Sequence, residues 1–185
     1  MILISVCVFV SACSANQPTV VQKLDELSAV TVTYGATPMV MSVDEPYGQS
    51  NERRYVQIGS FEINRMGSRT YYLWLGISGL DENHVASGSA TAFESIELLL
   101  DNQSLNLDVV GWLPRSVGIG EPVYKKLYAT SIEAYYPITL AQIQLLANSR
   151  TPKIRTAGSE PVEYMPWYQQ AAFKKGLEEF LVMVN

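Results

Sequence analysis

Histidine and cysteine are scarce in this chain. Among 185 residues there is one histidine, His84, and there are two cysteines, Cys7 and Cys13. Protein zinc sites are built from several ligands, and structural ones take them almost entirely from cysteine and histidine. The scarcity of both residue types therefore predicts that the chain has no metal site, and we expect no cofactor.

Positive charge is scarce as well. The chain has 13 lysines and arginines against 18 aspartates and glutamates, which gives a formal net charge of −5. Nucleic-acid binding depends on basic side chains that neutralise phosphates, and attraction to anionic lipid headgroups depends on basic clusters. The sequence therefore predicts no nucleic-acid partner and no electrostatic contact with a membrane.

A long apolar run is also missing. The run at the start of the chain, Met1 to Ala12, has twelve residues, whereas a membrane-spanning helix needs roughly 20. A short apolar run that ends in small residues is typical of a secretory signal peptide, which normally begins with positive charge. No lysine or arginine precedes this run, and we expect the natural start to lie upstream of Met1.

The end of this run carries a family resemblance. The four residues Val10-Ser11-Ala12-Cys13 resemble the lipobox of bacterial lipoproteins, in which the signal peptide is cut before the cysteine and the cysteine is acylated. The resemblance implies that residues 1–12 are removed and that Cys13 carries the membrane anchor. Ser14 follows where an aspartate would resemble the inner-membrane retention signal, which implies an outer-membrane protein facing the periplasm. Several acyl chains give stable attachment, at about 0.8 kcal/mol for each buried methylene, so we expect them to be the whole membrane contact.

The remaining chain suits one domain. Residues 13–28 are polar and contain Pro18, which predicts a tether behind the lipidated cysteine, and residues 29–185 are long enough for a single hydrophobic core. Of the whole chain, 48% is hydrophobic and 17% charged, which is ordinary for a globular domain. With Cys7 removed and Cys13 acylated, no cysteine is left for a disulfide, so we expect stability to come from packing.

The hydrophobic pattern predicts strands first and helices later. Apolar residues alternate with polar ones in most of the chain before Pro137, which is typical of half-buried strands. Thr139 and Gln142 fit a capping box at the start of a helix, and a second helix carries an apolar stripe interrupted by Gly176. The order indicates a mostly β (α+β) fold, an antiparallel β-sandwich or bent sheet with two helices in the C-terminal third. Strands are expected at 29–34, 54–64, 70–77, 90–100, 105–109, 123–136 and 151–156, and helices from 139 and over 167–184.

The sequence predicts no catalytic residue. His84 lies in a polar loop, Asp81-Glu82-Asn83-His84, and such residues are what loops are made of. Residues 86–90 do not form the Gly-x-Ser-x-Gly elbow of a serine hydrolase, and Gly118-Ile119-Gly120 lacks the third glycine of a nucleotide-binding loop. Carboxylate pairs that could serve glycoside cleavage are expected to be solvated surface: Glu94 with Glu97, and Glu178 with Glu179.

Aromatic residues give the best candidate for a binding surface. Tyr164, Trp167 and Tyr168 lie at the entry to the last predicted helix, with Tyr164 inside the predicted loop, residues 158–166. Tyrosine and tryptophan combine a flat apolar face with a polar tip and are enriched at binding hot spots. We therefore predict exposure for these three, whereas the tyrosines of residues 123–136 are expected to pack in the core and on the sheet.

These observations support three functional hypotheses. The first is an outer-membrane-anchored lipoprotein, not an enzyme, whose periplasmic domain binds or scaffolds an envelope component, most simply a protein. The second is a carbohydrate or peptidoglycan binder, which requires Trp167 to be accessible to solvent. The third is an envelope hydrolase with a carboxylate-based site, which requires acidic side chains to converge in one pocket.

Overall fold

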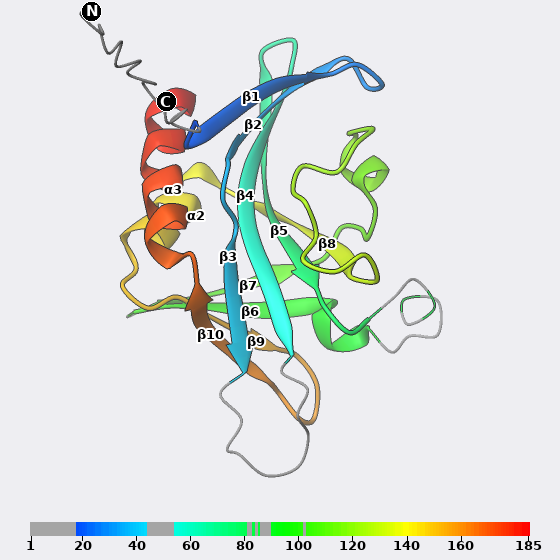
Figure 1. The fold of residues 1–185 in the computed structure, drawn as a ribbon, viewed down its shortest axis with the longest axis vertical. Helices are drawn as coiled ribbons and strands as arrows, with labels where there is room; N and C mark the ends of the chain where they lie inside the picture. Colours follow the sequence, from blue (N-terminus) through cyan, green and yellow to red (C-terminus); the bar gives the residue numbers. More distant parts are fainter. Residues whose placement is uncertain (1–17, 44–53, 81–82, 84, 86–89, 102) are drawn as a thin grey trace, which may run out of the picture.

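The computed structural model describes residues 18–43, 54–80, 83, 85, 90–101 and 103–185. The predicted signal peptide, Cys13 and His84 lie outside the described residues. Within them the chain forms an antiparallel sheet with two α-helices (Figure 1). The strands are β1 (Val20–Asp25), β2 (Val30–Gly35), β3 (Met39–Val43), β4 (Tyr55–Arg65), β5 (Ser68–Ile77), β6 (Ser95–Leu100), β7 (Gln103–Asp108), β8 (Ile132–Ile138), β9 (Lys153–Thr156) and β10 (Glu163–Tyr168), and the helices are α2 (Leu140–Asn148) and α3 (Gln170–Val184), with 3-10 turns at Thr91–Phe93 and Pro114–Val117.

The expected fold class is confirmed. Ten strands join in one sheet in the order β1-β2-β4-β3-β10-β9-β6-β7, and β5 pairs with both β4 and β8. Every strand pair is antiparallel. The two helices follow in the C-terminal third, so the chain is mostly β with segregated helices, as the sequence predicts.

Strand β4 is where the sheet bends. One half of its eleven residues pairs with β2 and the other half with β3, along the same edge. On one branch of the sheet β2 pairs with β1, and on the other branch β3 pairs with β10. The sheet therefore divides into two branches at β4 and curls. Past β7 the chain reaches β8, where Gly111 and Tyr135 form a bridge whose N–H···O distances are 2.8 Å (Val110 to Tyr135) and 3.0 Å (Tyr135 to Gly111).

The sheet has a hydrophobic core on each face. The inner core lies between the sheet and the two helices, and the outer core lies between the sheet and the segment that carries Val117, Ile119, Val123 and Tyr124. Val56 and Ile58 of β4 enter the inner core whereas Phe61 and Ile63 enter the outer one, which confirms the alternation expected for this strand. We call the two sides of the sheet the inner face and the outer face.

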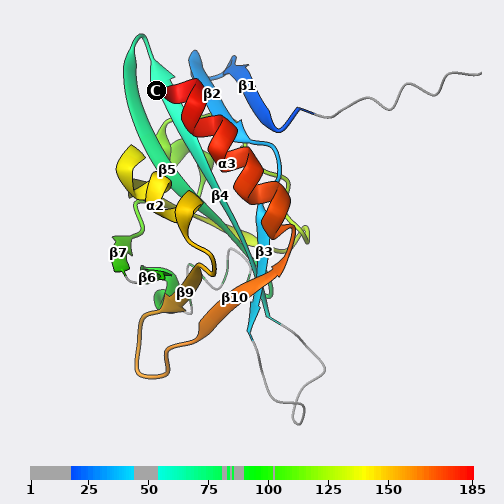
Figure 2. The same cartoon turned by 90° about the vertical axis from the view of Figure 1, so that its left-hand side faces the viewer.

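Both helices form as their local sequence signals predict. The Thr139 hydroxyl accepts a hydrogen bond from the Gln142 amide at 3.2 Å, and the Gln142 side chain accepts one from the Thr139 amide at 2.8 Å. Helix α3 lies across the inner face, as Figure 2 shows, and packs on β1, β2, β3 and β4. None of the helices in the described part of the chain is long and apolar enough to cross a membrane. Four residues of the predicted apolar stripe of α3 are buried, and the fifth, Leu181, is half-buried; the buried four are Phe173, Leu177, Phe180 and Val184.

The predicted tether is too long. Val20–Asp25 forms strand β1, which makes a continuous antiparallel ladder with β2. The polar composition of this segment was misleading, because β1 is an edge strand and its solvent side tolerates polar residues. Residues 20–25 are therefore not part of a tether, and the domain begins about ten residues earlier than the sequence predicts.

Other boundaries also differ. The strand predicted over 90–100 begins only at Ser95, because Thr91–Phe93 forms a 3-10 turn. The long strand predicted over 123–136 begins only at Ile132, because Val123 and Tyr124 leave the sheet and fill the outer core. The loop predicted over 158–166 contains the start of β10, and Trp167 and Tyr168 belong to that strand. Helix α3 starts at Gln170, after Gln169 adopts a left-handed conformation with φ 65°.

Candidate functional site

Trp167 and Tyr168 are adjacent and exposed on the outer face of β10. Pro166 lies opposite Met41 and Tyr168 lies opposite Val40, so the register shifts and Trp167 is an extra residue in the strand. Without this shift the alternation of a strand would send the two rings to opposite faces. The shift, a β-bulge, re-aims side chains, and the two side chains are 56% and 63% exposed respectively.

Tyr164 does not belong to this surface, and its predicted exposure is wrong. Its side chain is 4% exposed and lies in the inner core, where its ring centroid is 6.1 Å from that of Phe93. The cause is strand alternation, since Tyr164 sits one residue from Met165 and so faces the opposite side of β10. Tyr164 fixes the strand that carries the exposed pair.

A ladder of charged side chains adjoins the aromatic pair. Glu163 and Met165 alternate with Tyr164 along β10, so they share the outer face with Trp167. Lys153 donates to Glu163 at 2.6 Å, and Arg155 bridges Glu163 at 3.1 Å and Glu97 at 2.9 Å. The Lys153 hydrogen bond, together with Arg155, holds the pKa of Glu163 below its ordinary value. The outer face therefore presents exposed rings beside partly exposed hydrogen-bonding groups.

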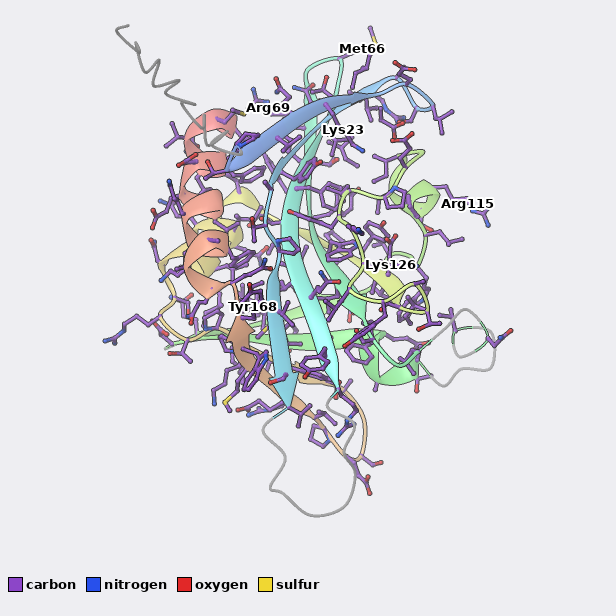
Figure 3. All side chains as sticks on the ribbon, in the orientation of Figure 1. Lys23, Met66, Arg69, Arg115, Lys126 and Tyr168 are labelled. Carbon is purple, nitrogen blue, oxygen red and sulfur yellow. The ribbon has the colours of Figure 1, made fainter. Side chains whose placement is uncertain are left out.

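Residues that pair across neighbouring strands form a row that starts at Tyr168 of the aromatic pair and stays on one face of the sheet. From Tyr168 it crosses β3, β4 and β5 and ends on β8, and Figure 3 shows Tyr168 and Lys126 on opposite sides of β4. In the middle of the row the Gln57 side chain accepts from the Leu127 amide at 2.6 Å and donates to the Lys125 carbonyl at 3.3 Å. The members of the row are Tyr168, Val40, Gln57, Gly76 and Glu133.

The segment bound by Gln57 exposes two more apolar side chains. Leu127 is 43% exposed and Tyr128 49% exposed. Neighbouring strands lie about 4.8 Å apart, and Gln57 is two strands from Tyr168, so this segment stands roughly 10 Å from the aromatic pair along the row. Leu127 and Tyr128 are therefore apolar side chains of similar exposure outside the aromatic pair, and they can serve as a control for it.

Glu133, at the end of the row, is a buried carboxyl. Only 5% of the residue is exposed, and its Oε2 accepts a hydrogen bond from the Tyr135 hydroxyl at 2.6 Å. Burial raises the pKa of Glu133, against the opposing effects of Tyr135 and Lys126. The Trp74 indole beside the carboxyl also opposes the rise in pKa. The sequence gives one weak signal for this group, a glutamate inside the apolar run Ile132 to Tyr136.

Glu62 is a second buried carboxyl, and it lies on the opposite face. Burial raises the pKa of Glu62, and the Arg69 guanidinium, 3.8 Å away, opposes the rise. Glu62 pairs with Tyr71, on the inner face, whereas Glu133 lies beside Tyr135 of the outer core. Paired-carboxylate chemistry needs both groups on one substrate, and the sheet stands between these two.

The other sequence candidates do not gather into a site. Glu97 is paired with Arg155, and Glu178 and Glu179 are exposed on α3. His84, Ser87 and Ser89 lie outside the described residues. In the part of the chain that the structure describes, no group of three or more histidine, cysteine, aspartate or glutamate side chains could hold a metal ion.

Comparison of the chain with protein-family models, with curated proteins and with solved structures finds no match. The candidate site therefore rests on the geometry of Trp167, Tyr168 and their surroundings.

Proposed function

We propose that this chain is a binding protein of the bacterial envelope, anchored in the outer membrane by lipid on Cys13, whose periplasmic domain contacts its partner through Trp167 and Tyr168. The observation that carries the proposal is the register shift in β10, which places both rings on the outer face. The lipobox-like residues before Cys13 support the anchor. We propose an envelope protein as the partner.

The energetics of the pair favour a contact surface. A bulge disrupts the backbone ladder locally, and here it turns Tyr168 away from the core side where strand alternation would otherwise place it. Large exposed apolar groups in soluble domains tend to mark interaction sites, and tryptophan and tyrosine are enriched where binding energy is concentrated. Binding of a partner over the two rings would remove their apolar surface from water, and this burial would contribute favourably to the free energy of binding.

The anchor makes even a weak contact effective. Confinement of the domain to one membrane surface raises its effective concentration toward any partner at that surface. A modest interface centred on two aromatic side chains is then sufficient for occupancy. The contact should weaken when Cys13 cannot be acylated, although the aromatic surface itself is unchanged.

A double alanine variant tests this proposal. Trp167→Ala with Tyr168→Ala should reduce in-cell crosslinking to a dominant envelope protein by at least tenfold, since hot-spot truncations commonly cost about 2 kcal/mol or more. Leu127→Ala with Tyr128→Ala is the matched control, because it removes similarly exposed apolar groups from the same face. Equal loss in both variants, or in neither, would contradict the assignment of the surface.

A wall glycan is a second candidate ligand, favoured by the charged ladder beside the rings. Sugars stack on aromatic faces and take hydrogen bonds from polar groups, and Lys153, Arg155 and Glu163 supply such groups on the same face of the sheet as Trp167. Co-sedimentation with purified peptidoglycan tests it. Binding by the wild-type chain that is lost in the Trp167 and Tyr168 double variant supports the glycan, and no co-sedimentation of the wild-type chain excludes it.

A further inference from the structure

Apolar side chains gather at one end of the molecule. Figures 1 and 2 both show the turn between β1 and β2, the turn between β4 and β5, and the last turn of α3 at the same end. These three segments carry side chains that are far more exposed than apolar residues usually are in a domain with a well-filled core. They are Leu27 (76% exposed), Met66 (101%), Val182 (82%) and Met183 (52%), and Leu24 (64%) lies beside the first turn at the end of β1.

The chain enters the domain beside this end. Thr19, just before β1, is hydrogen-bonded through its side chain to Glu179 of α3, and its carbonyl accepts from the Ala36 amide at 2.8 Å. Six residues, 14–19, separate Cys13 from Val20. At no more than about 3.5 Å per residue, they span roughly 20 Å when fully extended. An acylated Cys13 would therefore keep the C-terminal half of α3 close to the lipid surface.

We expect little electrostatic attraction between this end of the domain and anionic lipid headgroups. Lys23 is 3.5 Å from Glu121, and Arg69 is bound to Glu62 and to the Val184 carbonyl. Figure 3 shows Lys23, Arg69 and Met66 together at this end. Arg65, next to Met66, is bound to the Gly118 carbonyl at 3.3 Å and keeps its charge. Exposed carboxylates lie in the same segments, at Glu26 and Glu179, so the end offers apolar insertion and little net attraction for anionic headgroups.

We propose that this end of the domain docks on the lipid surface, with Met66, Val182 and Met183 entering the interfacial region of the bilayer. The inference rests on the proposed anchoring through Cys13. It goes beyond the sequence expectation that the acyl chains are the whole membrane contact. Side chains buried in the interface contribute apolar area to binding, as amphipathic interfacial segments do.

Docking at this end would determine how far Trp167 and Tyr168 lie from the membrane and which way they face. Trp167 and Tyr168 precede α3, and the apolar end includes its last turn. A helix of 15 residues is about 22 Å long at about 1.5 Å per residue. The aromatic pair would therefore be held roughly a helix length above the membrane, turned toward the periplasm.

A fluorescent probe at each end of the domain tests the proposal. In acylated protein reconstituted in phosphatidylcholine vesicles, an environment-sensitive dye on Met66→Cys should shift to the blue and be quenched by brominated lipid. The same dye on Ser159→Cys, in the exposed turn between β9 and β10, should show neither effect. Similar spectra at both positions would overturn the proposal.

Two further measurements separate docking from anchoring. Intact mass shows directly whether Cys13 is acylated, so a chain that lacks the acyl mass contradicts the proposed function and not the docking. In the acylated chain, Val182→Gln with Met183→Gln should remove most of the blue shift at position 66, because the replacements are polar at exposed sites and leave the core intact. An unchanged shift would contradict insertion of α3. A shift that depends on anionic lipid would contradict apolar docking.

Discussion

Gly176 of α3 lies directly against Gly35 of β2. A methyl group added to Gly176 would be 3.5 Å from the Gly35 Cα and 3.2 Å from the Thr19 carbonyl oxygen. Glycine at both positions therefore lets the helix approach the backbone of the sheet. Glycine inside a helix costs about 1 kcal/mol relative to alanine, and this close approach is the compensating gain. It also ties α3 to the segment by which the chain enters the domain.

Replacement of Gly176 by leucine should destabilise the domain by about 2 kcal/mol, as overpacked sites typically do. The side chain would meet backbone atoms of β2 and Thr19, which cannot move without separating α3 from the sheet. Lys175→Leu, on the exposed side of the same helix, should stay within about 0.5 kcal/mol of the wild type. Urea unfolding of both variants measures the difference, and equal stabilities would contradict the close packing.

Gly59 is required beneath the ring of Tyr124. A methyl group on Gly59 would lie 2.4 Å from the ring, which is fixed by a 2.7 Å hydrogen bond to the Ser60 carbonyl and by contact with Trp74. Gly59→Ala should therefore cost about 1–3 kcal/mol. In the double variant with Tyr124→Leu, the added methyl should cost much less than in the wild-type background. Additive losses in a double-mutant cycle would contradict the clash.

Glu133 should make stability fall as pH rises. Its folded-state pKa is raised from 4.5, so the folded state binds the proton more tightly than the unfolded state does. The free energy of unfolding then declines from about pH 4.5 up through the folded pKa. Glu133→Gln, which cannot ionise beside Tyr135 and Lys126, should gain stability relative to wild type across this range.

Glu163→Gln is the matched control with the opposite sign. The pKa of Glu163 is lowered from 4.5, so its contribution is present above that value and is lost as pH falls through the folded pKa. Relative to wild type, Glu163→Gln should lose stability as pH rises toward 4.5 and then differ by a constant amount, whereas Glu133→Gln should gain stability as pH rises above 4.5. Urea midpoints measured from about pH 3 to about pH 8 compare the two, and a Glu133→Gln difference that stays constant above pH 4.5 would contradict the assignment of Glu133 as a buried acid.

The capping box of α2 gives a local stability prediction. Thr139→Ala removes the acceptor for the Gln142 amide and should cost about 1 kcal/mol. Thr139→Ser keeps the hydroxyl and should recover most of the loss. Thermal unfolding of the two variants distinguishes them, and equal melting temperatures would show that the hydroxyl does not stabilise α2.

Local signals explain which parts of the fold could be predicted from the sequence. The alternation around Ile58, the capping box at Thr139 and the stripe ending at Val184 depend on neighbours in the chain, and each is confirmed. Strand β1 could not be distinguished from a tether, because an edge strand and a linker share polar composition and differ only by pairing with β2. The same limit applies to β3, because its partner β10 is distant in sequence.

The candidate site depends on strand register and on contacts between distant segments, which the pattern of neighbouring residues does not reveal. Adjacent aromatics in a strand should diverge, and only the register shift opposite Val40 puts Trp167 and Tyr168 on one face. Tyr164 was predicted to join them because the proline nearby suggested a loop. Glu133 is buried with Lys126 nearby, and Gln57 of a distant strand holds the segment that carries Lys126. Pairing between distant segments, which leaves little trace in a single sequence, decided all three.

Site-specific photocrosslinking in cells tests the central claim most directly. A photoreactive amino acid at position 168, in the chain with Cys13 intact, should crosslink to one dominant envelope partner. The same group at position 128 should give little product, and Cys13→Ala should reduce the product from position 168. Partner crosslinks from position 128 with none from position 168 would contradict the assignment of the aromatic pair as the binding surface.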